Sequence, residues 1–373
     1  MNFDLTDEHI IFKTIAGSTL YGLEGEGSDR DYRGVCLPPF EVMMSPFKRF
    51  ETKIDHSKDD EETHTLEKVI NLAAQCNPNV IELLFVPEEF IVKTTPTWGI
   101  IREQRDSFIS KEAEFRFKGY AAGQVKRAAL HRLYLINSPT HRPTREEFGL
   151  IEGKQIKKDQ FIAFMAVLDK NLFGQIPTWQ DLTREERSIV FDGMSDLCAI
   201  YAENVGLTAL EKEDRYSSEI EEDLKLQKAN YLGFSSDFIE VAKREKKYYS
   251  ALGKYNSYET WKASRNPKRA EMEAKFGYDA KHLSHTIRLL HMALEIGEGK
   301  GVIPNRKGID DDFLKSIKFH GAMKYEDIMD YVEKLRDKIT AAFKASSLPQ
   351  NPDRARLEGV YLTAINKHYG IKR

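Results

Sequence analysis

The sequence lacks any apolar run close to the roughly 18–20 residues that a membrane-spanning helix needs, so we expect no membrane association. Its first residues, Met1 to Asp4, lack the basic-then-apolar order of a signal peptide. Only 3 cysteines occur in 373 residues, and none belongs to a Cys-x-x-Cys pair. These absences argue against a disulfide framework and against a cysteine zinc site, and they predict a cytoplasmic protein.

The sequence also lacks the basic excess that many nucleic-acid-binding proteins carry, because 56 Lys and Arg are set against 59 Asp and Glu. Any contact with RNA or DNA therefore has to come from a local patch. Hydrophobic residues make up 41% of the chain, enough for a sizeable core. The length predicts two domains, or one domain with a large extension, but nothing in the sequence indicates an oligomeric state.

Two short motifs near the N-terminus point to chemistry. Gly17 and Ser18 follow a strand-like run over residues 12–16, and Asp29 and Asp31 stand two apart at the start of the next apolar run. Residues i and i+2 of a strand point to one face, so we expect the two carboxylates side by side with a divalent cation between them. Gly17 lets a ligand come close, and Ser18 offers a hydroxyl and a backbone N–H to an anion.

The order Gly-Ser-x-x-x-Gly and then Ser-Asp-x-Asp resembles the active-site signature of the DNA polymerase β-like nucleotidyltransferase superfamily. With Tyr-Gly after Gly-Ser and Arg-Gly-Val after the second Asp, it is similar to a branch of predicted nucleotidyltransferases associated with RNA repair in phages and bacteria. Further segments resemble this branch, and they are residues 77–85, 119–132, 143–146 and 281–290. Residues 155–275 show no such resemblance.

The resemblance implies a function as well as a fold. It implies that Asp29 and Asp31 bind Mg²⁺ (or Mn²⁺), and that an NTP such as ATP is the substrate. An acceptor hydroxyl would attack the α-phosphate by a two-metal mechanism and release pyrophosphate, with Gly17 and Ser18 holding the β- and γ-phosphates. The name of the branch suggests an RNA acceptor, such as a tRNA 3′ end.

A third metal-binding carboxylate is expected on the strand after the Asp-x-Asp strand. The acidic run over residues 59–65 is either a solvated loop or this strand, and as a strand it would place Asp60, Glu62 and His64 on one face. We expect Glu62 to be the third ligand, with Asp60 as the alternative and Glu67 as a further candidate.

Helical periodicity dominates from about residue 111 to the end. We therefore predict an α+β fold, with a small mixed-sheet nucleotidyltransferase domain over residues 1–110 and a mainly helical domain over residues 111–373 that closes the active-site cleft. A helix over residues 115–136 would place Tyr120 and Arg127 on one basic face, together with Gln124 and His131. This face is either a solvated stripe or a wall that faces the phosphates.

A second informative helix is predicted over residues 278–298, with Asp279 as its N-cap. Lys281, His285 and Arg288 fall at i, i+4 and i+7, so we expect them to hold the triphosphate or the pyrophosphate. A metal site built from the histidines of this helix is rejected, because no carboxylate or cysteine joins them at ligand spacing. The histidines are His282, His285 and His291.

Two other functions remain open at this point. The first is a catalytically silent nucleotide- or RNA-binding module, against which the intact pair of aspartates counts. The second is an enzyme that transfers AMP or UMP to a protein. The long helical extension counts against the second, because such relatives in the superfamily are usually short single domains.

Overall fold

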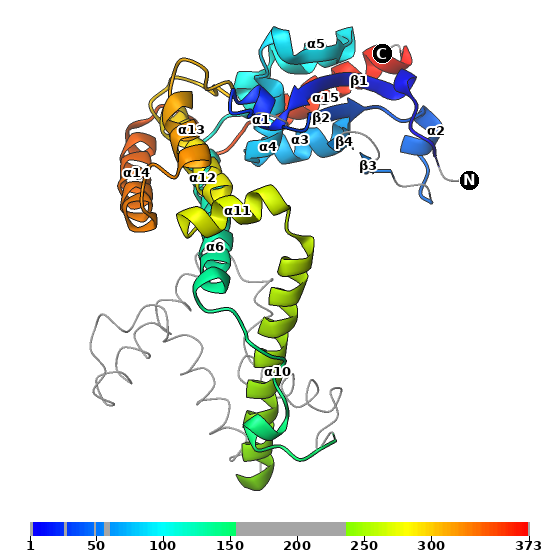
Figure 1. Ribbon diagram of the computed structural model, residues 1–373. Coiled ribbons are helices and arrows are strands. Elements are labelled where there is room, and N and C mark those ends of the chain that lie inside the picture. Colours follow the sequence, from blue (N-terminus) through cyan, green and yellow to red (C-terminus); the bar gives the residue numbers. More distant parts are fainter. Residues whose placement is uncertain (1–2, 26–27, 48–49, 56–59, 154–235, 372–373) are drawn as a thin grey trace. The chain divides into compact units, whose positions relative to one another are not determined.

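The computed structural model (Figure 1) describes residues 3–25, 28–47, 50–55, 60–153 and 236–371. These residues group into two compact units, formed by residues 1–138 with 265–373 and by residues 139–264. The predicted α+β class is confirmed, since a mixed sheet in the N-terminal part is followed by a mainly helical region. The predicted helical domain includes residues 154–235, which lie outside the described part of the chain. The predicted boundary near residue 110 stays a prediction.

The first unit contains a five-stranded sheet with the order β3-β4-β2-β1-β5. Strand β2 pairs in parallel with β4, while the other neighbours are antiparallel. The strands are Ile10–Ala16 (β1), Asp31–Cys36 (β2), Thr52–Asp55 (β3), Asp60–Thr65 (β4) and Ile91–Thr94 (β5). Residues 60–65 of the acidic run are therefore a strand that lies between β3 and β2, and its Thr and His residues suit a pleated sheet better than a free loop.

The register of the three central strands brings charged side chains to one face. Ala16 of β1 lies opposite Asp31 of β2, and Asp31 lies opposite Asp60 of β4. Arg33 lies opposite Glu62 in the same parallel pair. Opposed residues and residues two apart share a face, so Asp31, Arg33, Asp60 and Glu62 all project from the same side of the sheet.

Short helices accompany the sheet, and their bounds are Gly17–Leu20 (α1), Phe40–Met43 (α2), Leu66–Ala74 (α3), Pro78–Leu84 (α4) and Pro96–Glu103 (α5). Among the described residues, 3₁₀ turns occur at Asp7–His9, Glu88–Phe90 and Arg105–Phe108 in the first unit and at Glu146–Phe148 in the second. The Asn77 side chain caps α4 by accepting from the Asn79 N–H at 3.1 Å. Phe12 of β1 stacks on Trp98 of α5 at 4.5 Å between ring centroids, which anchors α5 to the sheet.

The rest of the first unit is helical. Its helices are Glu112–Ile136 (α6), Pro267–Phe276 (α11), Ala280–Gly297 (α12), Asp311–His320 (α13), Tyr325–Ala345 (α14) and Arg354–Tyr369 (α15). Helix α12 packs against α6, α13 and α14, and its residues Leu283, Ile287 and Leu290 are fully buried, while Leu294 is half-buried. Helix α15 packs against α3 and α5, so the end of the chain returns to the helices beside the sheet (Figure 1).

The described part of the second unit consists of a loop region over residues 139–153 and helix α10 (Ser236–Ser264). Arg145 donates a bidentate pair of hydrogen bonds to the buried Glu245, and Arg244 donates to the carbonyl of Gly149 at 3.2 Å. The loop region is thus tied to α10. No described helix combines the length and the apolarity that a bilayer crossing demands.

Candidate active site

A cavity of about 350 Å³ lies in the first compact unit, where β1, β2 and the Gly-Ser turn meet helices α4, α6, α12 and α13. Seven of the predicted site residues line it, and they are Gly17, Ser18, Asp31, Arg127, Lys281, His285 and Arg288. Gln124, from the predicted basic face, also lines it. The cavity therefore joins motifs that lie more than 250 residues apart in the sequence.

The Gly-Ser turn and Asp31 fit together closely. Gly17 has φ +61°, a left-handed conformation that glycine adopts without steric cost. A Cβ atom added to Gly17 would lie 1.7 Å from Oδ2 of Asp31. The glycine is required here both for the turn and for the room that the Asp31 carboxylate occupies.

The Asp31 carboxyl group is half-buried, and burial is the main cause that raises its pKa. The Arg33 guanidinium opposes this increase, while the Asp60 and Asp29 carboxylates add to it. Asp29 is exposed and precedes the first residue of β2, so the prediction that both aspartates stand on one strand is wrong for Asp29. Asp29 lies close enough to Asp31 to interact by charge, but it does not line the cavity.

The two candidates for a third carboxylate have different surroundings. Asp60 lies directly beside Asp31 in the parallel register, and adjacent strands are about 4.8 Å apart. Glu62 lies one step further along β4, where Oε2 is 3.5 Å from Nε of Arg33 and Oε1 is 3.4 Å from Nε2 of His64. Glu62 thus has two cationic or hydrogen-bonding neighbours, whereas Asp60 adds to the negative charge around Asp31.

Cationic side chains from three helices also line the cavity. Arg127 comes from α6, Lys281 from α12 and Lys318 from α13. Burial, and then the charge of Lys281, lower the pKa of Lys318 to about 8, and its Nζ donates to the carbonyl oxygen of Leu23 at 2.6 Å. The charges of Lys281 and Lys318 repel each other in this cavity, so the cavity favours an anionic ligand, which would relieve the repulsion.

A buried ion pair forms another part of the cavity wall. Arg288 is fully buried and donates through Nη1 to Oε1 of Glu82 at 2.6 Å, while Tyr21 donates to Oε2 of Glu82 at 2.7 Å. The guanidinium also stacks on the Tyr21 ring at 3.5 Å from its centroid. Burial, and then the Glu82 charge, raise the pKa of Tyr21, so its hydroxyl stays protonated as a donor. Arg288 is thus engaged with Glu82, although the sequence suggested a phosphate ligand.

Two other predicted residues have local partners. Burial, and then the charge of Arg288, lower the pKa of His285 well below its ordinary value, so this imidazole is neutral near pH 7. The Tyr120 hydroxyl accepts a hydrogen bond from Nδ2 of Asn77 at 2.7 Å, and Tyr120 does not line the cavity. His285 is therefore part of the cavity as a neutral group, and Tyr120 links α6 to the N-cap of α4.

Sequence reasoning missed several residues of the cavity. Glu82 carried a usable signal, because a single acidic residue within an otherwise apolar run is a sign of a buried ion pair. Lys318 carried none, since it is one of many lysines on the predicted helices. The rejection of a metal site on α12 rested on a reason that is wrong, because the Asp279 carboxylate accepts from Nδ1 of His282 at 2.6 Å.

Comparison with known proteins agrees with the resemblance drawn from the motifs. Residues 4–133 match the model of RlaP, the RNA repair pathway DNA polymerase beta family. The chain is also 27% identical over 128 residues to an uncharacterized 38.9 kDa protein of Enterobacteria phage T4, from the nrdC-mobD intergenic region. That match covers 31% of this chain and 38% of the phage protein. No solved structure matches the chain.

The predicted resemblance to the polymerase β-like superfamily and to its RNA-repair branch is thus confirmed. The matched segment contains the Gly-Ser turn, Asp31, Asp60, Glu82 and Arg127. It supports a nucleotidyltransferase-type role.

Proposed function

We propose that this protein is a metal-dependent nucleotidyltransferase, which moves an NMP group from an NTP to an acceptor hydroxyl and releases pyrophosphate. The observation that carries the proposal is the position of the Asp31 carboxylate. It lies against Gly17 in a cavity that Arg127, Lys281 and Lys318 also line. A carboxylate for a metal and cations for phosphates in one cavity are the parts that nucleotidyl transfer needs.

The proposed metal ligands are Asp31, Asp29 and one carboxylate of β4. Carboxylate oxygens are the ligands that Mg²⁺ and Mn²⁺ prefer, so this donor set suits either ion. The register favours Asp60 over Glu62, because Asp60 is opposite Asp31 and Glu62 is beside Arg33. When bound, such ions lower the pKa of the attacking hydroxyl and stabilise the leaving pyrophosphate.

The side chains of this protein would bind and orient the NTP. Ser18 and the backbone at Gly17 would hold the β- and γ-phosphates, as the signature implies, and both residues line the cavity. Lys281, Lys318 and Arg127, which also line the cavity, would neutralise the triphosphate. The helices after residue 111 thereby complete a cavity whose carboxylates come from residues 1–110, which is the division of labour that we propose for the two parts of the chain.

The proposed acceptor is the 3′ end of an RNA, such as a tRNA. The description of the matched family as an RNA repair pathway family supports this acceptor. Two other outcomes compete with it, a protein acceptor of AMP or UMP and a silent module that binds the nucleotide without transfer.

The test uses the purified full-length protein with each NTP labelled at the α-phosphate, Mg²⁺ or Mn²⁺, and a mixture of short RNAs. Label on RNA supports the proposal in full, and label on the protein supports transfer to a different acceptor. Transfer of the label to an acceptor has to disappear in Asp31→Asn. A matched control, Asp7→Asn at an exposed residue outside the cavity, is expected to retain this transfer. No transfer by the wild type under any of these conditions would contradict the proposed activity.

A further inference from the structure

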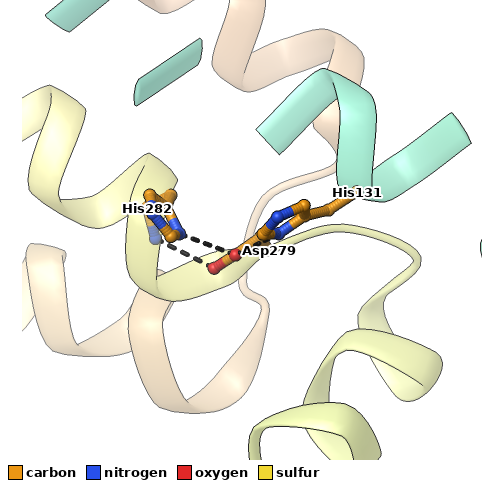
Figure 2. Close-up of side chains that lie close together, drawn as sticks. All are labelled: His131, Asp279 and His282. Carbon is orange, nitrogen blue, oxygen red and sulfur yellow. Dashed lines mark hydrogen bonds and ion pairs between the residues drawn. The ribbon is translucent and has the colours of Figure 1, made fainter. Parts of the chain in front are cut away.

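One carboxylate in the first unit holds two histidines from different helices (Figure 2). Asp279 precedes α12, and its Oδ2 accepts from Nδ1 of His282 at 2.6 Å and from Nδ1 of His131 at 2.8 Å. His131 belongs to α6, far from Asp279 in the sequence. The two imidazole rings lie edge to face, with 5.6 Å between their centroids. Two helices thus direct the same kind of atom toward one carboxylate oxygen.

The position of Asp279 is also fixed by a contact that does not involve the imidazole rings. Its Oδ1 accepts from the backbone N–H of His282 at 3.0 Å and so caps α12. The Asp279 side chain is fully buried, whereas the side chains of His131 and His282 are 18% and 17% exposed. Burial of a carboxylate is costly unless hydrogen bonds or positive charge compensate it, and a bound divalent ion would supply such charge.

We propose that His131, Asp279 and His282 bind a divalent transition metal ion, with Zn²⁺ as the best-suited ion. Imidazole nitrogen and carboxylate oxygen are the ligands that this class of metal prefers, at about 2.0–2.2 Å. The three ligand atoms lie within 4.8 Å of one another, so small rotations of the side chains bring them around one ion. The metal takes the place of the proton on each Nδ1, and that proton moves to Nε2 of the same ring.

This site differs in chemistry from the proposed carboxylate site at Asp31. Two of its three ligands are nitrogens, which Mg²⁺ binds poorly, so excess Mg²⁺ does not fill it. Three protein ligands leave at least one coordination position for water or for an oxygen of a bound molecule. Because His282 also lines the cavity, the metal lies at the edge of that cavity and within reach of an anionic ligand there. The proposal does not depend on nucleotidyl transfer.

The test measures metal binding by the full-length protein without any nucleotide. The protein is first freed of metal with a chelator and is then titrated with Zn²⁺ in excess Mg²⁺ by calorimetry, and with Co²⁺ by visible absorption. We expect one equivalent of Zn²⁺ to bind, Co²⁺ to give the spectrum of a low-coordinate nitrogen and oxygen site, and Zn²⁺ to raise the melting temperature.

Three variants and one control decide the outcome. His131→Ala, His282→Ala and Asp279→Asn are each expected to weaken Zn²⁺ binding at least about 100-fold, since each removes one of three ligands. Asparagine is a good N-cap, so Asp279→Asn keeps α12 capped and separates ligand loss from misfolding. His320→Ala, at an exposed histidine of α13, is expected to bind as the wild type does. Absence of stoichiometric Zn²⁺ binding, or equal binding by folded His282→Ala, would overturn the proposal and leave a purely hydrogen-bonded cluster.

Discussion

The Asp31 carboxylate occupies the space where a side chain of residue 17 would begin, since a Cβ on Gly17 would lie 1.7 Å from Oδ2 of Asp31. The two residues face each other across the paired ends of β1 and β2. The pairing explains why the turn and the carboxylate belong to one site. The glycine fixes the backbone of the turn and also the place of the carboxylate.

Gly17→Ala is therefore expected to reduce transfer at least about 100-fold, roughly 2.7 kcal/mol in the activation barrier, by displacing Asp31. The left-handed φ adds about 1–2 kcal/mol of instability. Steady-state kinetics and thermal unfolding measure both effects. Gly119→Ala is the matched control, because Gly119 lies inside α6 and an added Cβ would meet no atom within 4 Å. This variant is expected to gain about 0.5–1 kcal/mol of stability. Full activity in Gly17→Ala would show that the position of Asp31 does not matter.

Asp60→Asn and Glu62→Gln distinguish the two carboxylates of β4. If Asp60 is the metal ligand, Asp60→Asn loses transfer at least about 100-fold and Glu62→Gln retains it within about threefold. The reason is the parallel register, which pairs Asp60 with Asp31 and Glu62 with Arg33. Titration with Mn²⁺ at saturating NTP measures the metal dependence of each variant. The reverse pattern would assign the third ligand to Glu62, as the sequence first suggested.

The pKa of Lys318, at about 8, predicts how NTP binding depends on pH. A bound triphosphate favours the charged lysine, so affinity is highest below pH 8 and falls as the pH rises above 8. Calorimetric affinities from pH 7.5 to 9.5 avoid the titration of the phosphate itself near pH 6. Lys318→Arg keeps its charge throughout this range and is expected to flatten the curve. A wild-type curve as flat as that of Lys318→Arg would remove Lys318 from the binding site.

The ion pair of Glu82 and Arg288 predicts a stability effect rather than a specific loss of binding. Glu82→Gln leaves the Arg288 charge buried without its partner, so we expect a loss of about 3–5 kcal/mol in the free energy of unfolding. Glu82→Gln with Arg288→Met removes both charges and is expected to recover much of that loss. Urea unfolding of the two single variants and the double variant gives the coupling energy. Additive effects would mean that the two side chains do not depend on each other.

Local sequence patterns predicted the parts of the site that depend on local structure. The row of Lys281, His285 and Arg288 follows from helical spacing, and the Gly-Ser turn follows from the motif at residues 17 and 18. The start of β2 was harder to predict from the sequence, because a strand boundary depends on pairing with other strands as well as on the strand's own residues. Asp29 therefore lies in the loop before the strand rather than on it.

Long-range contacts account for what the sequence did not predict. The choice between Asp60 and Glu62 depends on the register of β4 against β2. Both residues lie on the same face of β4, so an acidic run does not reveal which of them lies opposite Asp31. Lys318 enters the cavity only because α13 packs against α12, and Asp279 meets His131 only because α6 packs there too. Composition and periodicity place such residues on helices, but they do not say which helices meet.

The most direct measurement is the thermal stability of the wild type and of Asp31→Asn with Mg²⁺ or Mn²⁺ and each of the four NTPs. A ligand that binds only the folded state raises the melting temperature by mass action. If the cavity around Gly17 and Asp31 is a metal–NTP site, the wild type shifts only when metal and an NTP are both present. Asp31→Asn then shows no such shift. An equal shift in Asp31→Asn, or none in the wild type with any NTP, would contradict the assignment of this cavity.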